Sequence, residues 1–433
     1  MTSSIKNNII FYLLFLTPFT FVLGISIMEI STFLITLFFF LKNRDLNYFK
    51  DTKFLFLFIF SLYVAINAFF QIHDNLKISS FFFFRYVILA LSIFFVLNYL
   101  ENNFIKNKKN ILLVFSYLLL FIFFDSFLQF ITQTNLFGFE MINQRISSLF
   151  GSELILGSFL IKLLPLFLYL LFYLKIKINT NFLKLALFFG LYFSVIYLAA
   201  GRTSFFIMCL LILLIIIFIK ELRLIFSIGV FFLVSFIFIT QIFEIGKSNP
   251  SNRLFVKTFN EMTNHIFYNN QKKQNLENSK SIKKNDVVEN IKIFSIDHHG
   301  HYVLAYELFK KNFVFGIGPK GFRYYCRSVE YNPPKGICST HPHNFVVQIL
   351  TETGLIGFVF YIYAFIFVIF KMFRVYAKKI PSNEKNCFFV ISIALITIFF
   401  PFVPNGNFFN NWISITSFYY IGIYLYSYKH VYL

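Results

Sequence analysis

Twelve apolar segments are the feature of this sequence that most limits its fold. Each has about the length, roughly 20 residues, with which an apolar helix crosses a bilayer. Polar loops separate them, and all but one of these loops are short. The segments lie at about residues 8–23, 25–41, 54–72, 79–99, 111–131, 154–174, 184–200, 204–219, 224–240, 344–370, 387–403 and 412–427. We therefore expect an all-α membrane protein with about twelve transmembrane helices.

The composition supports a membrane protein and excludes the soluble classes. Of the 433 residues, 58% are hydrophobic, only 13% are charged, and 70 are Phe. The net charge of +20 is also typical of proteins that bind nucleic acid. Here, however, many Lys and Arg lie in short loops between apolar segments, and no soluble segment combines a basic patch with aromatic residues. We expect the lipid bilayer, and no nucleic acid, as a partner.

The basic residues also predict the orientation. In the alternate short loops, nineteen Lys and Arg fall in the set that includes both chain ends, whereas the other set holds only Lys77, Arg145 and Arg202. By the positive-inside rule, both termini are expected to be cytoplasmic. The chain then divides into helices one to nine (1–240), a large external loop (241–343) and helices ten to twelve (344–433). Residues 264–292, rich in Asn, Lys and Gln, are expected to form a mobile insertion in that loop.

The junction between the external loop and the tenth apolar segment carries the strongest functional signal. It runs from Cys338 to Gly357 as CSTHPHNFVVQILTETGLIG. Pro suits the first turn of a helix, so the spacing predicts a helix that starts near Pro342, with His343 in its first turn. Free backbone N–H groups and the helix dipole there favour an anion.

The helical period arranges the side chains of this predicted helix on two faces. His343, Gly354 and Gly357 share one face, where the small glycines allow a neighbouring helix to approach closely. Glu352 points roughly the other way and is expected to be buried and hydrogen-bonded, with a functional role as the alternative. The ordinary pKa of histidine suits a general base near neutral pH, so His343 is the candidate catalytic residue, with a structural or capping role as the alternative.

Two external arginines are candidates for binding an anion. Arg145 lies in NQRISSLFGSE, just before a membrane helix, and Arg202 lies in the tight turn AAGRTS between two apolar segments. Thr203 or Ser204 is expected to cap the next helix, with Arg202 beside its positive end. A guanidinium fixed beside helix-terminal N–H groups is suited to a phosphate or diphosphate. Contact with a lipid headgroup is the alternative.

Two of the four cysteines are expected to form a disulfide. Cys326 and Cys338 both lie in the external loop, where an oxidising compartment permits the bond, and it would stabilise the fold by roughly 2–3 kcal/mol. Free thiols or two metal ligands are the alternatives. Cys209 and Cys387 lie in or beside apolar segments and are expected to pack without a chemical role.

The remaining polar features of the chain carry weaker signals. A short amphipathic helix is expected at about residues 302–311, followed by the glycine turn GIGP, which does not follow a strand and is not a dinucleotide-binding motif. The histidines and Asp297 show no metal-site spacing, so no metal is expected; they are His298, His299, His301, His341 and His343. Charged residues inside apolar segments are weak candidates for a cavity or an ion pair, namely Arg85, Asp125 and Lys162.

The residues described so far resemble the O-antigen ligase and polymerase family. HNFVVQILTETGLIG has the form of the family's His-Asn, nine residues, Gly, two residues, Gly motif. AAGRTS, GIGPKGF and QRISSLFG are similar to three other family segments, so the resemblance covers about residues 145–357. One departure is clear: where family members often carry an Arg ahead of the amphipathic helix, this chain has His301, and Arg323 is the nearest candidate to replace it.

The resemblance implies a GT-C-like, metal-independent glycosyltransferase without cofactors. Its substrates would be a glycan on undecaprenyl diphosphate and, for a ligase of lipopolysaccharide biosynthesis, lipid A-core on the periplasmic face of the bacterial inner membrane. His343 would be the base, Arg145, Arg202 and Arg323 would bind the diphosphate, and the Phe-rich segments would hold the prenyl chain. His301, Asn344 and Glu352 would support the acceptor side.

Three alternative functions stay open beside the ligase. A polymerase would extend the glycan on its own carrier, and a relative within the family would glycosylate protein. A flippase or transporter is the alternative from another class. Transporters often place polar groups at the membrane midplane in repeated halves, whereas here the polar groups cluster at one end and no internal repeat is found.

Overall fold

The computed structural model describes residues 3–42, 51–71, 80–103, 105–246, 248–261, 296–327 and 338–432. The insertion predicted at 264–292 lies outside this part of the chain. Apart from two isolated β-bridges, the described residues form helices and loops. The elements are α1 (Ser3–Leu16), η1 (Thr17–Leu23), α2 (Ile25–Lys42), α3 (Thr52–Gln71), α5 (Phe84–Glu101), α6 (Asn110–Thr132), η3 (Ser148–Phe150), α7 (Leu156–Tyr173), η4 (Asn179–Asn181), α8 (Phe182–Leu198), α9 (Arg202–Phe218), η5 (Lys220–Leu222), α10 (Arg223–Ile242), η6 (Asn252–Val256), α12 (Ile296–Lys311), α13 (Phe322–Tyr325), α14 (Phe345–Tyr376), α15 (Ser382–Ile398) and α16 (Asn411–Tyr432).

Each of the twelve predicted apolar segments is helical in the structure, with α1 and η1 together forming the first. Within the described ranges, eight helices are long and apolar enough to cross a membrane, whereas α8 and α9 are shorter apolar helices. The prediction of an all-α, polytopic membrane protein is confirmed. The number of crossings, twelve, remains a prediction, because α8, α9, α15 and α16 do not reach the length and apolarity of the other eight.

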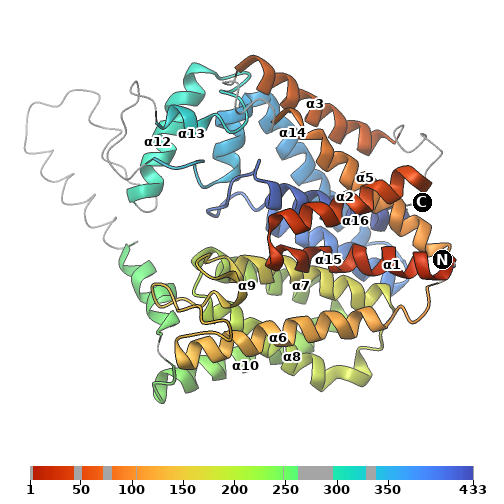
Figure 1. Ribbon diagram of the computed structural model, residues 1–433, viewed down its shortest axis with the longest axis vertical. Coiled ribbons are helices and arrows are strands. Elements are labelled where there is room, and N and C mark those ends of the chain that lie inside the picture. The colour runs from red at the N-terminus through yellow and green to blue at the C-terminus, as the bar shows by residue number, and fades with distance from the viewer. Residues whose placement is uncertain are drawn as a thin grey trace, which may run out of the picture.

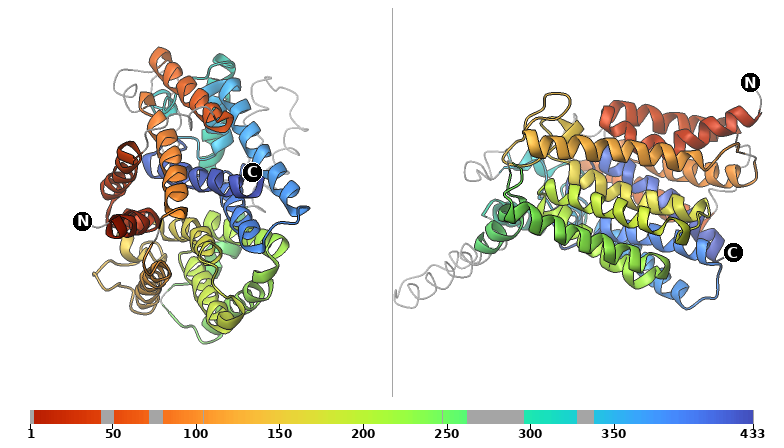
Figure 2. Two further views of the ribbon diagram at one scale, coloured as in Figure 1. Left: turned by 90° about the vertical axis from the view of Figure 1, so that its right-hand side faces the viewer. Right: turned by 90° about the horizontal axis from the view of Figure 1, so that it is seen from below.

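The long helices run side by side as one bundle (Figure 1). Both chain termini lie at one end, which we call the terminal end, and α12 and α13 lie at the opposite end, which we call the α12 end. The two further views in Figure 2 show the same separation. The loop at 133–155 and the start of α9 lie at the α12 end as well (Figures 1 and 2). The alternation of short loops therefore collects the candidate residues at one end of the bundle.

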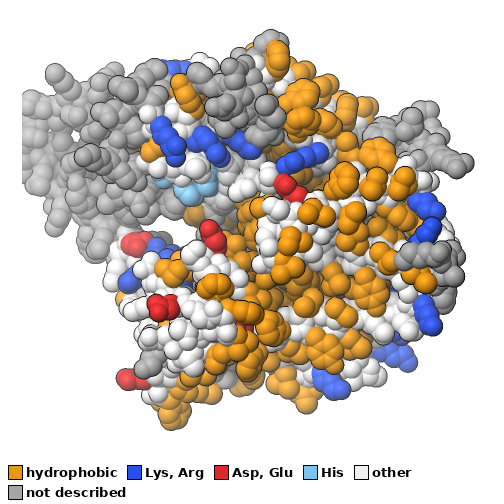
Figure 3. Space-filling view, viewed as in Figure 1, with side chains coloured by type: hydrophobic (Ala, Val, Ile, Leu, Met, Phe, Trp, Pro, Cys, Tyr) orange, Lys and Arg blue, Asp and Glu red, His pale blue; other side chains and the backbone are white. Residues whose placement is uncertain are grey.

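Aromatic and aliphatic side chains fill the centre of the bundle. α16 packs against α5 and α15, α15 packs against α7, and α8 packs against α10. Glycine allows two of these contacts to be close: a Cβ on Gly422 of α16 would overlap the carbonyl oxygen of Ala90, and one on Gly190 of α8 would overlap the ring of Phe232. Apolar side chains also cover the flank of the bundle between its two ends (Figure 3), as a lipid-facing surface requires.

Candidate functional site

Helix α14 is interrupted at Gly354, where φ is 63° and ψ is −165°. In a continuous helix, the amide of Leu355 would donate to the carbonyl of Thr351. Here Leu355 N donates instead to Phe313 O at 3.0 Å, and Thr351 O accepts from Ile317 N at 2.9 Å. The next helical bond is exchanged in the same way, because Ile356 N donates to Val314 O and Glu352 O accepts from Gly318 N. The loop segment at 313–318 therefore satisfies the backbone of the broken helix.

Helix α3 closes the same break from its other side. Tyr63 donates its hydroxyl proton to the carbonyl of Thr353 at 2.6 Å, and the side-chain amide of Asn67 donates to the carbonyl of Phe315. An unsatisfied backbone group at membrane depth would be costly, so these bonds make an interrupted helix tolerable there. The prediction that the glycines admit a neighbouring helix is wrong, since Gly354 admits the backbone of Val314, and a Cβ on Gly357 would meet the side chain of Thr353 in the same helix.

The predicted start of this helix at Pro342 is also wrong. α14 begins at Phe345, and Asn344 is its N-cap, whose side-chain oxygen accepts from Val347 N at 3.1 Å. Asparagine is among the best N-cap residues, and this hydrogen bond outweighs the weaker preference of proline for the first turn. His343 consequently lies outside the helix, with a positive φ of 58°.

The His343 turn is held in this rarely adopted conformation from two sides. The carbonyl of His343 accepts from Asn405 N at 2.8 Å, and the side-chain amide of Asn344 donates to Pro401 O at 2.7 Å. Positive φ values in residues other than glycine persist only where the surroundings enforce them, and they cluster at functional sites. Ser339 Oγ lies 2.9 Å from His343 Nε2, within hydrogen-bonding distance.

Three histidines from two segments surround this turn. The ring centroid of His343 lies 4.2 Å from that of His341 and 5.3 Å from that of His301, which belongs to α12. His301 and His341 are both buried, and His341 Nε2 lies 3.2 Å from the carbonyl oxygen of Asn405. Nowhere in the described ranges do three or more His, Cys, Asp or Glu side chains stand so that together they could hold a metal ion.

Glu352 is fully buried below this histidine cluster and is hydrogen-bonded on both sides. One carboxylate oxygen accepts from Gln348 Nε2 at 2.8 Å, and the other accepts from Phe322 N at 3.1 Å. Gln348 also donates to the side chain of Asn407 and accepts from Phe408 N. Glu352 therefore ties α13 and the loop before α16 to the first half of α14.

The two loop cysteines are bonded to each other, with their Cα atoms 5.4 Å apart. Cys326 directly follows α13, and Cys338 directly precedes Ser339, whose hydroxyl contacts His343. The bond therefore joins α13 to the turn that carries the histidine. Cys387 is buried and Cys209 is exposed on α9, and both are free thiols.

Three arginines from distant parts of the chain gather around the tight turn between α8 and α9. Arg145 donates to the carbonyl oxygens of Ala199 and Leu154, both at 3.1 Å. Arg253 donates to Ala200 O at 3.2 Å, and Arg202 begins α9. Burial, and then the nearby charge of Arg253, lower the pKa of Arg145 to about 10. We call Arg145, Arg202 and Arg253 the arginine cluster.

The start of α9 differs from the prediction in two ways. Gly201 is the N-cap and makes no side-chain hydrogen bond, so neither Thr203 nor Ser204 caps the helix; Ser204 Oγ instead lies 3.2 Å from Ser158 Oγ. Arg202 is not an isolated cation, because it forms a two-pronged ion pair with Glu261, with N–O distances of 2.6 and 2.9 Å. Arg145 and Arg253, by contrast, donate to backbone carbonyls, so their charges are not balanced by these bonds.

Arg323 lies in α13 at the histidine side of the α12 end. Burial lowers the pKa of the nearby Lys320, the charges of Arg323 and Arg85 lower it further, and the charge of Glu352 acts in the opposite direction. Arg323 Nε is buried and has no hydrogen-bond partner among the described residues. Figure 3 shows the histidine side chains beside a group of Lys and Arg side chains on this part of the surface.

The loop at 399–410 connects the arginine cluster to the histidine turn. The ring of Phe206, one turn after Arg202 on α9, lies 6.0 Å from the ring of Phe400. The next residue, Pro401, accepts the hydrogen bond from Asn344. The loop at 399–410 therefore contacts both the His343 turn and α9, the helix that Arg202 begins.

The three weaker candidates have structural partners. Arg85 forms an ion pair with Glu29 at 3.5 Å and hydrogen-bonds to Tyr86 and Asn411. Asp125 accepts from the hydroxyl of Ser148 and from two other groups in the loop that follows α6. The ammonium group of Lys162 lies 4.4 Å from the centre of the Trp412 ring.

A comparison with protein families finds one match in this chain. Residues 185–362 match the model of a family described as O-antigen ligase. This match supports an assignment to the O-antigen ligase and polymerase family. The matched range contains the turn before α9, Arg253, α12, α13 and the break in α14. No curated protein matches this chain.

The assignment implies a glycosyltransferase-like membrane enzyme. Sequence reasoning missed several residues of the candidate site. Arg253 lies in no recognisable motif. Asn405 and Asn407 lie in a loop that is about 60 residues further along the chain than His343, so the sequence did not indicate their contacts with the site. Ser339 lies four residues from His343 in the quoted motif, so its spacing could have suggested the contact.

Proposed function

We propose that this chain is an O-antigen ligase, which transfers a glycan from an undecaprenyl diphosphate carrier to lipid A-core. The observation that carries the proposal is that the loop at 399–410 contacts both the His343 turn and α9, which Arg202 of the arginine cluster begins. A base and a group of cations at one end of a membrane bundle suit a reaction between two lipid-linked substrates. The family assignment supports the glycosyl transfer itself.

His343 is proposed to activate the acceptor hydroxyl. The oxygen of Ser339 lies 2.9 Å from His343 Nε2, which is the distance that an acceptor oxygen would need for proton transfer. We propose that the acceptor hydroxyl replaces the Ser339 hydroxyl at this nitrogen when the substrate binds. The hydrogen bonds from Asn405 to the His343 carbonyl and from Asn344 to Pro401 would keep the ring in position during the reaction.

The arginine cluster is proposed to bind the diphosphate of the donor. Guanidinium groups pair with phosphate oxygens in fixed geometry and stabilise negative charge that develops as the bond to the sugar breaks. Arg145 and Arg253 are anchored to backbone carbonyls, so their positions are set before substrate arrives. Arg323, with its buried Nε, is proposed to contact the donor or acceptor from the histidine side.

The proposed step balances without a cofactor or a metal. The acceptor oxygen attacks the anomeric carbon and loses its proton to His343. The bond between this carbon and the diphosphate oxygen breaks, and the diphosphate leaves with the electron pair. Attack from the side opposite the leaving group inverts the anomeric centre. The arginines would supply the positive charge that a metal ion supplies in other transferases.

The same proposal includes the location of the enzyme. The excess of Lys and Arg in the loops at the terminal end supports cytoplasmic termini in a bacterial inner membrane, with the α12 end on the periplasmic side. The interrupted α14 and the helical arrangement are compatible with a GT-C-like fold.

The test is to delete the gene for this protein and then to separate the surface lipopolysaccharide of the cells by size. Bare core, with the glycan retained on its carrier, is the expected result for a ligase. Core that carries a single repeat unit would instead show a polymerase, and unchanged lipopolysaccharide would exclude both. A plasmid copy with His343→Ala should fail to restore the polymer although it accumulates in the membrane, and restoration by this copy would contradict the role of His343.

A further inference from the structure

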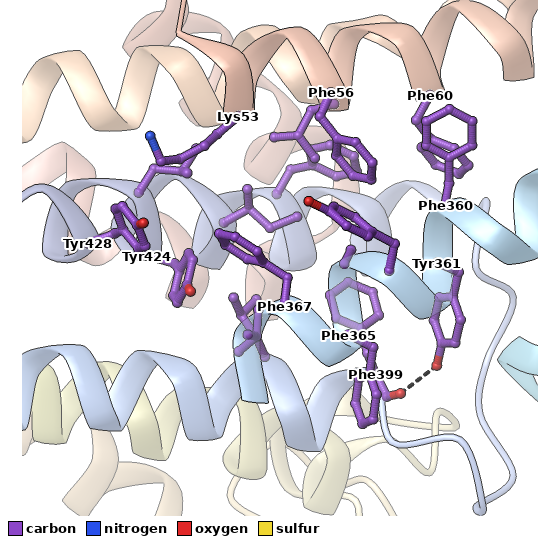
Figure 4. Close-up of a pocket in the computed structure, with 18 of the residues that line it drawn as sticks. Lys53, Phe56, Phe60, Phe360, Tyr361, Phe365, Phe367, Phe399, Tyr424 and Tyr428 are labelled. Atoms are coloured by element: carbon purple, nitrogen blue, oxygen red, sulfur yellow. Dashed lines mark hydrogen bonds between the residues drawn. The ribbon is translucent and has the colours of Figure 1, made fainter. Parts of the chain in front are cut away.

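A cavity of about 700 Å³ lies between α3, α14, α15 and α16. This size is typical of pockets that hold small molecules, about 300–1,000 Å³. Its walls are almost entirely apolar and rich in aromatic rings, which include Phe56, Phe60, Phe360, Phe365 and Phe367 (Figure 4). We call it the aromatic cavity. An apolar, aromatic wall of this kind suits a hydrocarbon chain.

One end of the aromatic cavity carries positive charge. Lys53 lies at this end together with Tyr424 and Tyr428 (Figure 4). The ammonium group of Lys53 is 5.0 Å from the centre of the Tyr428 ring, and that of Lys371 is 5.4 Å from the same ring. Lys53 also pairs with Asp51, at 3.1 Å, so part of its charge is already balanced.

This charged end belongs to the terminal end of the bundle. Tyr428 lies in the last turns of α16, and Lys53 lies in the first turn of α3. Lys371 and Lys378 both stack on Tyr432, with their ammonium groups 4.7 and 3.9 Å from the ring centre. Lysine and tyrosine together are typical of the level of lipid headgroups.

The opposite end of the aromatic cavity is closed by aromatic rings. Phe399 and Phe408 line the cavity and pack against Phe345, with ring centroids 6.3 and 5.4 Å from it. The hydroxyl of Tyr361 donates to the carbonyl of Phe399 at 2.5 Å (Figure 4), so it does not offer a donor to a ligand. Phe345 adjoins the Asn344 cap, and these rings therefore separate the cavity from the His343 turn.

We propose that the aromatic cavity binds an acyl chain of an anionic phospholipid from the leaflet at the terminal end. The hydrocarbon wall accepts the chain, and Lys53 and Lys371 attract the phosphate and its negative charge. The carrier lipid of the proposed reaction is a different ligand, because its diphosphate belongs at the α12 end. The rings of Phe345, Phe399 and Phe408 close the cavity on that side. The lipid site itself rests on the lining of the cavity and on its lysines, whereas its distinction from the carrier rests on the proposed function.

The experiment is native mass spectrometry of the intact protein, purified in mild detergent and exposed to equal amounts of phosphatidylglycerol and phosphatidylcholine with the same chains. Wild type should retain phosphatidylglycerol in preference. The double variant Lys53→Ala, Lys371→Ala should lose this preference by roughly tenfold or more, the effect expected for two cations at a charged lipid surface.

A second pair of variants tests the cavity itself. Ala364 lines the cavity on α14, so Ala364→Trp should fill it and remove the bound lipid. Ile366, on the same helix, is 57% exposed and does not line the cavity, so Ile366→Trp is the matched control and should retain the lipid. Size-exclusion chromatography checks that each variant is folded. If Ala364→Trp does not fold, the lysine variant still decides.

Three results would overturn the proposal. The first is equal retention of both phospholipids by wild type, and the second is an unchanged preference in the lysine variant. The third is displacement of the phospholipid by a polyprenyl phosphate in wild type, which would assign the cavity to the carrier.

Discussion

Gly316 lies directly against Gly354, so that a Cβ on Gly316 would overlap the backbone nitrogen of Gly354, and a Cβ on Gly354 would overlap the nitrogen of Gly316. Two glycines that are 38 positions apart thus allow the loop segment at 313–318 to replace the helical hydrogen bonds of α14. The glycine of GIGP and the glycine of the His-Asn motif form one structural unit.

The first prediction concerns this contact. Gly354→Ala should lower the free energy of unfolding by about 2–3 kcal/mol or more, because it adds a backbone overlap to the strain of a positive φ. Gly138→Ala is the control: Gly138 also has a positive φ, of 80°, but no atom lies within 4 Å of its added Cβ, so about 1 kcal/mol is expected. Thermal unfolding in one detergent measures both. Equal losses would contradict the close contact.

The second prediction separates His343 from its neighbour Ser339. His343→Ala should reduce glycan transfer at least 100-fold, the effect typical of losing a general base, while the protein still accumulates. Ser339→Ala should retain most of the activity, because the proposed acceptor replaces this hydroxyl. Transfer is measured with isolated membranes and a labelled donor. An inactive Ser339→Ala enzyme that binds both substrates normally would instead make the serine part of the machinery.

The third prediction concerns the arginine cluster. Arg253→Ala and Arg202→Ala should each reduce transfer at least 100-fold, and Arg253→Lys should recover only part of it, because an ammonium group cannot reproduce the forked geometry. Glu261→Gln should remain active, since it removes only the carboxylate that pairs with Arg202. If Arg253→Ala were as active as wild type, the cluster would not bind the donor.

The fourth prediction follows from the lowered pKa of Arg145. The pKa in the folded protein, about 10, is below the ordinary 12.5, so the charged form is disfavoured in the fold. The neutral side chain carries no such penalty, so this contribution to stability is present at strongly alkaline pH and is lost as the pH falls through 10. Near neutral pH Arg145 is charged, and its burial lowers the free energy of unfolding. A bound diphosphate offsets this cost.

The measurement is the thermal stabilisation of the protein by geranyl diphosphate as a function of pH. It should be constant from pH 7 to 9 and should fall as the pH approaches 10, where half of the Arg145 side chains lose their charge. Arg145→Gln should show weaker stabilisation without this fall. A wild-type profile that is flat through pH 10 would contradict the contribution of Arg145.

The fifth prediction concerns the disulfide. The double variant Cys326→Ser, Cys338→Ser removes a disulfide between residues 12 positions apart. The free energy of unfolding should fall by about 3 kcal/mol in the chain-entropy model. Because the bond joins α13 to the turn of His343, transfer should fall several-fold even at a temperature where the variant is fully folded. Cys209→Ser removes a free thiol and should leave transfer unchanged. Full activity of the double variant would show that the turn does not need this restraint.

The sequence predicted the helices well because membrane helices satisfy their own backbone within one apolar segment, and apolarity is visible locally. It also predicted that His343 and Arg202 lie at the starts of α14 and α9, respectively. It failed at the start of α14, where the Asn344 cap outweighs Pro342, and at Gly354, where the glycine admits a distant backbone segment.

The partners of the candidate residues could not be predicted, because they come from far along the chain. The ion pair of Arg202 with Glu261 and the hydrogen bond of Asn405 to His343 are tertiary contacts between loops without periodic patterns. Arg253 was missed for the same reason. A motif identifies which side chains carry the chemistry, whereas the loops that position them are known only from the fold.

The break in α14 also has a consequence for biosynthesis. Tyr63 donates to the carbonyl of Thr353, a residue that lies 290 positions later in the chain. At about 5–20 residues per second, a ribosome reaches this acceptor roughly 15–60 seconds after it has passed the tyrosine. Until then Tyr63 of α3 cannot form this hydrogen bond. The α12 end of the bundle, which carries the candidate site, can therefore be completed only when nearly the whole polypeptide has been delivered to the membrane.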